Sequence, residues 1–359
     1  MPHLAGVWRS EGEGMDQSRI LLIVRQFWEN AIKLLLEDPK NARDLLALCG
    51  ADIVKRIDLR RVKLIQTTFV ERDYRHVESD VVLLAPLRRE RGERTAKHLL
   101  IYILIEHQSE PDRLMPLRSL DYVVQIFKYQ VREWSKTHRT LARIRLHPVL
   151  PVVFYTGTQR WDSVGRLVDL VEMGERFESA TPAMEPRFIN LPVIAAETLE
   201  AQGGFFGWVL RLIQQRKTRP REFQRLLNRV VQHPETMPQA ERRRWLELLS
   251  YVMALVYHAR EPSEWPDLQQ AIEASVRTDE HRQEVFEMRR TIADELEERG
   301  AIRNRQQTLI RQLKRRFGDL PDELSSTIRA TNDPEQLDEW LDQVVTAKTL
   351  KEVGIEVPA

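Results

Sequence analysis

The chain of 359 residues contains a single cysteine, Cys49, and carries almost no net charge. One cysteine excludes an internal disulfide framework and any zinc site built from several cysteines, and it favours a reducing, cytoplasmic setting. The 55 Lys and Arg residues against 54 Asp and Glu residues give a formal charge of +1. The field of the whole molecule therefore does not select nucleic acid, and any surface for phosphates has to be a local basic patch.

Long hydrophobic runs are also absent. No purely apolar run exceeds the 7 residues of 99–105, whereas a helix needs about 20 to cross a bilayer. The N-terminus has no basic segment followed by an apolar stretch, as a secretory signal would have. These absences predict a protein without a membrane partner.

Changes in pattern along the chain predict four parts. Residues 1–18 are polar and contain glycine, which indicates a flexible N-terminus. We expect an α/β domain over residues 19–200, a helical extension over 201–300 and a small helical C-terminal domain over 301–359.

The first half alternates between helical and strand patterns. Apolar spacing predicts a helix over residues 22–35, a second helix after Pro39, and a third over 117–134 carrying Leu117, Val124 and Val131. Strand composition marks residues 62–70, 77–84, 99–106 and 148–157. The run at 99–106 has no alternation, which is typical of a central strand covered on both faces. Strand, helix and strand in succession predict a parallel crossover within a mixed sheet.

The second half is predicted to be mainly helical, with helices over residues 204–216, 221–232, 240–259 and 279–300. A further helix begins near Ile302 and ends at Gly318, and a last helix follows Pro334 with Leu337, Leu341, Val344 and Val345 facing inward. Such helices are candidates for homo-oligomer contacts. The basic runs 242–244 and 314–316 predict solvated faces, with phosphate contact as the alternative.

One constellation of polar residues has the pattern of a reactive site. Asp80 lies within VESDVVLL, and Glu106 and Gln108 end the apolar strand LLIYILIEHQ. The period of two along a strand directs Glu106 and Gln108 to one face and His107 to the other. A carboxylate that ends a buried strand needs a partner, and Mg²⁺ takes hard oxygen ligands. If the two strands are adjacent, Asp80 and Glu106 converge on a divalent cation that acts on a phosphodiester.

These motifs resemble those of a known family. A strand aspartate, a hairpin and a strand ending in Glu-x-Lys or a variant is similar to the PD-(D/E)xK nuclease fold, a mixed sheet flanked by helices. The run EHQSEPDRLMPLRSLDYVVQIF more narrowly resembles the Rpn family of recombination-promoting nucleases, also described as putative transposases. Asp80, Glu106, Gln108, Arg118 and Tyr122 match its motifs, and VVFYTGTQRW resembles its downstream strand. The segment 312–353 resembles a C-terminal helical module of unknown function.

The resemblance implies a Mg²⁺-dependent DNA endonuclease with little sequence preference. Asp80 and Glu106 would then bind the metal, and Gln108, where the signature usually has lysine, would position the water. Gln108 has no cationic charge, so Arg118 is the candidate for phosphate binding. The family usually begins its domain with a His-Asp pair, and the nearest acid here is Glu29. Glu29 is therefore either a metal-site acid on the first helix or an ordinary surface acid.

Two other functions remain open at this level. The chain could be a catalytically inactive nuclease-fold module that binds DNA or a protein, in which case the carboxylates are dispensable. It could also transfer DNA strands in transposition through the same metal site. No feature of the sequence separates strand transfer from hydrolysis.

Overall fold

A computed structural model describes residues 17–25, 27, 31–50, 55–65, 81–88, 100–232, 241–274, 276 and 279–355. The chain divides into two compact units, Met1–Glu284 and Val285–Ala359. Its helices are α1 Gln17–Arg25, α2 Ala31–Leu36, α3 Pro39–Ala47, α5 Met115–Thr137, α6 Ala196–Gln202, α7 Gly204–Gln214, α8 Pro220–Gln232, α9 Arg242–Ala259, α10 Trp265–Ala274, α11 Asp279–Phe317, α12 Asp322–Ala330 and α13 Pro334–Thr346. Its strands are β1 Lys63–Ile65, β2 Val81–Pro86, β3 Leu100–Gln108, β4 Val149–Tyr155 and β5 Arg187–Asn190.

The described strands form one mixed sheet in the order β1-β2-β3-β4-β5. The β1–β2 and β2–β3 pairs are antiparallel, and the β3–β4 and β4–β5 pairs are parallel. Helix α5 provides the crossover between β3 and β4, as the sequence predicts. The C-terminal ends of β3 and β4 therefore lie at the same edge of the sheet, where β2 begins.

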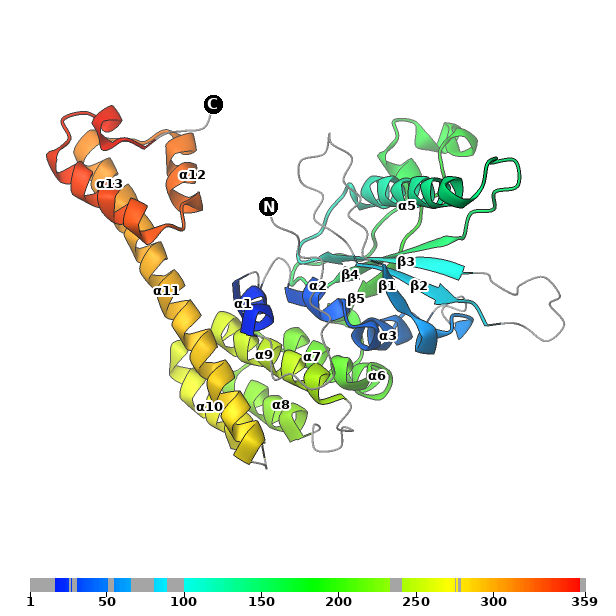
Figure 1. The fold of residues 1–359 in the computed structure, drawn as a ribbon, viewed down its shortest axis with the longest axis horizontal. Coiled ribbons are helices and arrows are strands. Elements are labelled where there is room, and N and C mark those ends of the chain that lie inside the picture. The colour runs from blue at the N-terminus through cyan, green and yellow to red at the C-terminus, as the bar shows by residue number, and fades with distance from the viewer. Residues whose placement is uncertain are drawn as a thin grey trace. The chain divides into compact units, whose positions relative to one another are not determined.

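Helices cover both faces of the sheet (Figure 1). Helix α5 lies along one face, and α2 and α3 lie on the other side, together with α6 and α7. On the α5 side, Tyr122 and Ile126 pack against Val82 of β2. Central strand β3 is thus buried on both sides, which explains why Ile103 and Ile105 are almost fully inaccessible and why its sequence shows no alternation. The predicted mixed α/β sheet with flanking helices and a helical C-terminal half is confirmed.

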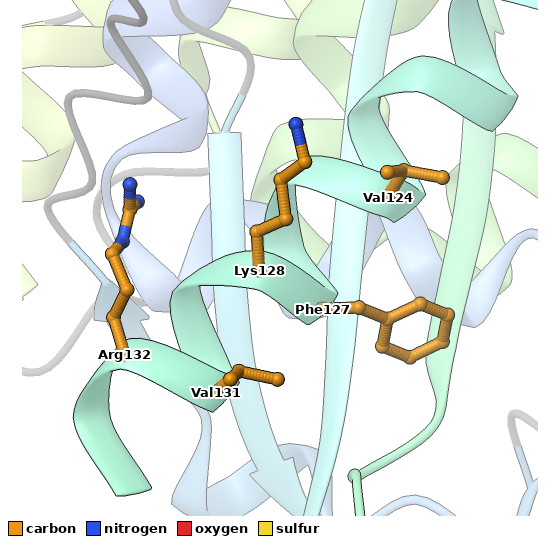
Figure 2. Close-up of a pocket in the computed structure, with 5 residues that line it drawn as sticks. All are labelled: Val124, Phe127, Lys128, Val131 and Arg132. Atoms are coloured by element: carbon orange, nitrogen blue, oxygen red, sulfur yellow. The ribbon is translucent and has the colours of Figure 1, made fainter. Parts of the chain in front are cut away.

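The face that α5 presents to the sheet differs from the apolar stripe that identifies this helix in the sequence. Its buried residues are Met115, Pro116, Ser119, Tyr122, Val123, Ile126 and Gln130. Leu117 and Val124 of the stripe are 49% and 39% exposed. A shallow pocket of about 450 Å³ lies here, lined by Val124, Phe127, Lys128, Val131 and Arg132. Figure 2 shows the three apolar side chains pointing to one side and the two cations pointing away from them. None of the described residues that line this pocket carries a carboxylate.

Several predicted helices have different bounds. The helix expected over residues 22–35 contains two described helices, α1 and α2, with Phe27 in a turn. The helix expected at 279–300 does not end at Gly300, because α11 continues to Phe317. Gly318 follows with φ at 84°, the left-handed conformation that ends a helix. Strand β5 and helices α6 and α10 were not predicted. The predicted division of the chain into four parts stays a prediction.

The second unit has a core of its own, built from α11, α12 and α13. Leu309, Leu313, Ile328, Leu337 and Trp340 are among its buried residues. Val345 was predicted to face inward, but its side chain is 67% exposed, because Val344 takes the buried position on that turn of α13.

The two basic runs, 242–244 and 314–316, each contain an arginine that forms specific contacts. Arg316 of the second unit donates hydrogen bonds to the carbonyl oxygens of Val344 and Val345 at the end of α13. Arg244 does not belong to a solvated face: it is 4% exposed, and its guanidinium pairs with Asp44 of α3 and donates to Asn41 Oδ1 over 2.7 Å. This buried ion pair joins α3 to α9. Within the described residues, no helix is both long enough and apolar enough to cross a membrane.

Candidate active site

The tripeptide at the end of β3 directs its side chains to opposite faces of the sheet. Gln108 Nε2 donates a hydrogen bond of 2.7 Å to Glu106 Oε1, which shows that these two side chains lie on one face, as predicted. His107 points the other way, with Nε2 2.8 Å from Oγ1 of Thr156. The strand therefore separates a carboxylate–amide pair from the imidazole between them.

Glu106 is almost completely buried, with 3% of its surface accessible. Arg118, on the first turn of α5, donates from Nη2 to Glu106 Oε1 over 2.7 Å. The same guanidinium donates from Nη1 to Asp112 Oδ2 over 2.8 Å and contacts the Tyr122 hydroxyl at 3.4 Å. Helix α5 thus places the Arg118 guanidinium against the carboxylate at the end of β3. Asp112 holds the same guanidinium through its other terminal nitrogen.

The environment shifts the pKa of both partners. Burial raises the pKa of the Glu106 carboxyl, and the charges of Arg118 and Lys33 together with the Gln108 hydrogen bond only partly offset that effect. Burial alone would lower the pKa of the Arg118 guanidinium, but the Tyr122 hydrogen bond and the neighbouring carboxylates raise it above its ordinary value. Arg118 therefore stays charged. Burial disfavours the ionised form of Glu106, and the charge of Arg118 partly offsets this effect.

One oxygen of the Glu106 carboxylate has no hydrogen-bond partner among the described residues. Oε1 receives both hydrogen bonds described above, whereas Oε2 is buried and accepts no hydrogen bond from any described residue. A buried carboxylate oxygen without a hydrogen bond destabilises the folded state. A hard divalent cation, which prefers oxygen ligands, would bind this oxygen and remove the cost. The donor chemistry at this position fits Mg²⁺. Among the described residues alone, no group of three or more His, Cys, Asp or Glu side chains could surround an ion.

Two predicted site residues, Asp80 and Glu29, lie outside the described residues. The chain neighbour of Asp80 is described: Val81 pairs with Ile105, the residue that precedes Glu106. Strands β2 and β3 are adjacent, which is the condition that the sequence analysis set for a shared cation. The metal-site roles of Asp80 and Glu29 stay predictions.

The opposite face of β3 holds a buried polar cluster that the sequence analysis did not find. Burial lowers the pKa of the His107 imidazole to about 3, and the charges of Lys33 and Arg216 add to this effect. Arg216 is buried and donates from Nη2 to the carbonyl oxygen of Thr156 over 2.9 Å, while the Thr156 amide donates to the Gln108 carbonyl over 2.9 Å. His107 is therefore neutral and supports the strand ends from behind the site.

A glycine allows the ends of β3 and β4 to approach. A Cβ atom built on Gly157 would lie 2.2 Å from the carbonyl oxygen of Ser109 and 2.2 Å from the Tyr155 hydroxyl. Tyr155 in turn packs edge-on against Trp161, with ring centroids 5.1 Å apart. The tight contact at Gly157 holds the loop after Gln108 in place.

Only some of the residues around Glu106 could have been predicted from the sequence. Asp112 could have been found, since it lies in the loop immediately before the helix that carries Arg118. Lys33 and Arg216 carry no such signal, because both are distant from β3 in the sequence and their proximity to this strand depends on tertiary packing. Arg118, predicted as a phosphate-binding residue, forms ion pairs with Glu106 and Asp112 in the structure.

Comparison with known proteins adds to this geometry. The family model described as "Putative transposase, YhgA-like" matches residues 28–244, more than half of the chain and including β3, α5 and β4. The chain belongs to this family. The predicted relationship to the Rpn family, also described as putative transposases, is confirmed.

Two relatives carry nuclease names. Over 128 residues, the chain is 33% identical to recombination-promoting nuclease RpnA of Escherichia coli strain K12, an alignment that covers 35% of this chain and 39% of RpnA. It is 27% identical over 128 residues to recombination-promoting nuclease RpnD of Escherichia coli O157:H7, covering 35% of this chain and 44% of RpnD. The chain thus spans less than half the length of these relatives. No solved structure matches it.

Proposed function

We propose that this family member is a metal-dependent DNA endonuclease of low sequence specificity that acts in recombination. The observation that supports this function most directly is the buried Glu106 carboxylate, whose Oε2 has no hydrogen-bond donor among the described residues while Arg118 and Gln108 hold Oε1. The names of the two relatives support a nucleic-acid substrate.

Asp80 and Glu106 are the residues that would hold a Mg²⁺ ion. When bound, the ion supplies charge that polarises the scissile phosphate and favours deprotonation of the attacking water. The register supports a role for Asp80, because its neighbour Val81 pairs with the neighbour of Glu106, and consecutive Cα atoms lie about 3.8 Å apart.

The remaining side chains have distinct roles in this proposal. Arg118 keeps Glu106 ionised and fixes its orientation, because its guanidinium is anchored on the other side by Asp112. Gln108 donates through Nε2 to Glu106 and is placed to orient a water with its amide oxygen. Part of the Arg118 side chain is exposed, which leaves its guanidinium able to contact a phosphate of bound DNA.

The test compares the nicking of supercoiled plasmid in Mg²⁺ by the wild type and by the isosteric variants Asp80→Asn and Glu106→Gln. We expect both variants to lose at least about a hundredfold in rate, because each removes a negative ligand from the cation. A matched control is Glu110→Gln, which changes an exposed acid just beyond the strand. Equal nicking by all four proteins, or nicking that persists in excess EDTA, contradicts the proposal.

The inactive binding module remains the second candidate, and one observation favours it. The ion pair with Arg118 already neutralises Glu106 without a metal. Mg²⁺ titration of the purified protein by calorimetry separates the two functions: a nuclease site binds Mg²⁺ and loses this binding in Glu106→Gln, whereas an inactive module shows no Glu106-dependent binding and still retains its DNA or protein partner.

A further inference from the structure

The turn between α7 and α8 concentrates positive charge at one place. Its sequence places Lys217, Arg219 and Arg221 within five residues, and all three side chains are exposed. No acidic side chain in the described ranges forms an ion pair with any of them. By contrast, the nearby Arg211 and Arg229 both pair with Glu200. Glu222 is the nearest acid in sequence and offsets part of the charge of this turn.

Hydrogen bonds place this basic turn at the same end of the sheet as the candidate active site, on the His107 side of β3. Arg216 donates to the Thr156 carbonyl over 2.9 Å, and the Thr156 amide donates to the Gln108 carbonyl over 2.9 Å. One residue further along the turn, Lys217 Nζ lies 3.5 Å from Oγ1 of Thr158. The turn therefore lies at the C-terminal end of β4, at the sheet edge where Glu106 and Gln108 end β3.

Besides Arg216, a second buried arginine holds the backbone of this turn. Arg260, at the end of α9, donates from Nη1 to the carbonyl oxygens of Arg216 and Thr218 over 2.9 and 2.8 Å. Its guanidinium is in turn fixed by Glu264, 2.6 Å from Nη2. The backbone that carries Lys217 is thus fixed before any ligand arrives, which lowers the entropy lost on binding.

The electrostatics of α8 favour an anion at the same position. Arg219 immediately precedes the helix, and Arg221 is its second residue. The N-terminus of a helix carries partial positive charge, so cations are unfavourable there and a bound anion is favourable. Two arginines at this end are therefore poorly placed for the stability of the isolated protein and well placed for contact with phosphates.

We infer that Lys217, Arg219 and Arg221 bind the phosphate backbone of the DNA duplex that flanks the cleavage position. The inference rests on the proposed function, because the adjacent phosphodiester site favours DNA over an acidic protein segment as the occupant. The contacts are with phosphates rather than base edges, so they contribute affinity and no sequence preference.

The test measures the affinity of the full chain for a fluorescent DNA duplex in EDTA, where cleavage cannot occur, over a series of salt concentrations. The test variant is Lys217→Ala/Arg219→Ala/Arg221→Ala. The matched control is Arg139→Ala/Arg143→Ala/Arg145→Ala, which removes three exposed cations just before β4, at the opposite end of that strand. The variant Arg219→Lys/Arg221→Lys keeps the charge, and circular dichroism checks that all variants fold.

We expect the test variant to bind at least about tenfold more weakly and the slope of log affinity against log salt to fall by about two to three, because each lost phosphate contact contributes about 0.9 to the slope. The control and the lysine variant should keep the wild-type slope. Equal losses in the test and control variants, absence of DNA binding by the wild type, or tighter binding of polyglutamate than of DNA each overturns the inference. DNA binding that depends on this turn in a protein that does not nick plasmid supports the inference and overturns the proposed nuclease function.

Discussion

Arg118 of α5 and Glu106 of β3 form an ion pair with 2.7 Å between Nη2 and Oε1, and this contact orients a carboxylate whose other oxygen is buried and unsatisfied within the described structure. The two residues come from the helix and the strand that make up a single parallel crossover. The geometry of that crossover therefore controls the chemistry of the carboxylate.

Loss of Arg118 is predicted to shift the pH dependence of nicking. Burial already raises the pKa of Glu106, and removing the opposing positive charge raises it further. Because only the ionised carboxylate holds a cation, activity is lost as pH falls through this pKa, and the acid limb of Arg118→Met should lie at higher pH than that of the wild type. Arg118→Lys should restore part of the shift, and we expect about 10–100-fold weaker Mg²⁺ affinity in Arg118→Met. An unchanged acid limb would falsify this role.

The buried pair between Arg244 and Asp44 is predicted to be important for stability. Arg244→Met removes the buried partner of Asp44 and leaves only the more exposed Arg43, 3.3 Å away, to pair with it, so we expect a loss of up to about 3–5 kcal/mol. Arg229→Met is the matched control, because Arg229 is 58% exposed in its pair with Glu200 and pairs at the surface contribute about 1 kcal/mol or less. Urea unfolding followed by circular dichroism measures both values, and similar losses in the two variants contradict the prediction.

His107 is predicted to make the protein sensitive to acid. Its pKa lies at about 3 in the folded chain and near 6.5 in the unfolded chain. The unfolded state therefore binds a proton that the folded state does not, and stability is complete above about pH 6.5 and falls between pH 6.5 and 3 by up to about 1.4 kcal/mol per pH unit. His107→Gln should flatten this dependence in urea unfolding measured across the interval. A slope identical to that of the wild type would assign the acid sensitivity to other groups.

Two glycine substitutions should have opposite effects. Gly157→Ala brings a Cβ within 2.2 Å of Ser109 O, so we expect a loss of about 1–3 kcal/mol together with reduced nicking, because the loop after Gln108 has to move. Gly300 lies within α11 and its Cβ would meet no atom within 4 Å, so Gly300→Ala should stabilise the helix by about 1 kcal/mol. Thermal unfolding and the plasmid assay test both, and a neutral Gly157→Ala contradicts the tight contact.

Local pattern predicts the sheet and the pairing of side chains on β3, but not the supports around them. The unbroken apolar run identifies β3 as central, and the period of two correctly joins Glu106 to Gln108. By contrast, Arg216 reaches Thr156 across 60 positions of sequence, and Arg244 reaches Asp44 across 200. Such contacts depend on tertiary packing, and the basic segments that contain Arg216 and Arg244 do not indicate which of their cations is buried and paired. The same limit applies to α5, where the conspicuous apolar stripe faces away from the sheet.

The alternation along β3 has a consequence for how this protein can change. The side chains of Glu106 and Gln108 lie on the α5 face of the sheet, and that of His107 lies on the opposite face. They form hydrogen bonds to different partners. Inserting or deleting one residue upstream in β3 would exchange the two sides completely, placing an imidazole against Arg118 and a carboxylate behind the sheet. Length variation in this protein should therefore be tolerated in the connections around the strand and rejected within it.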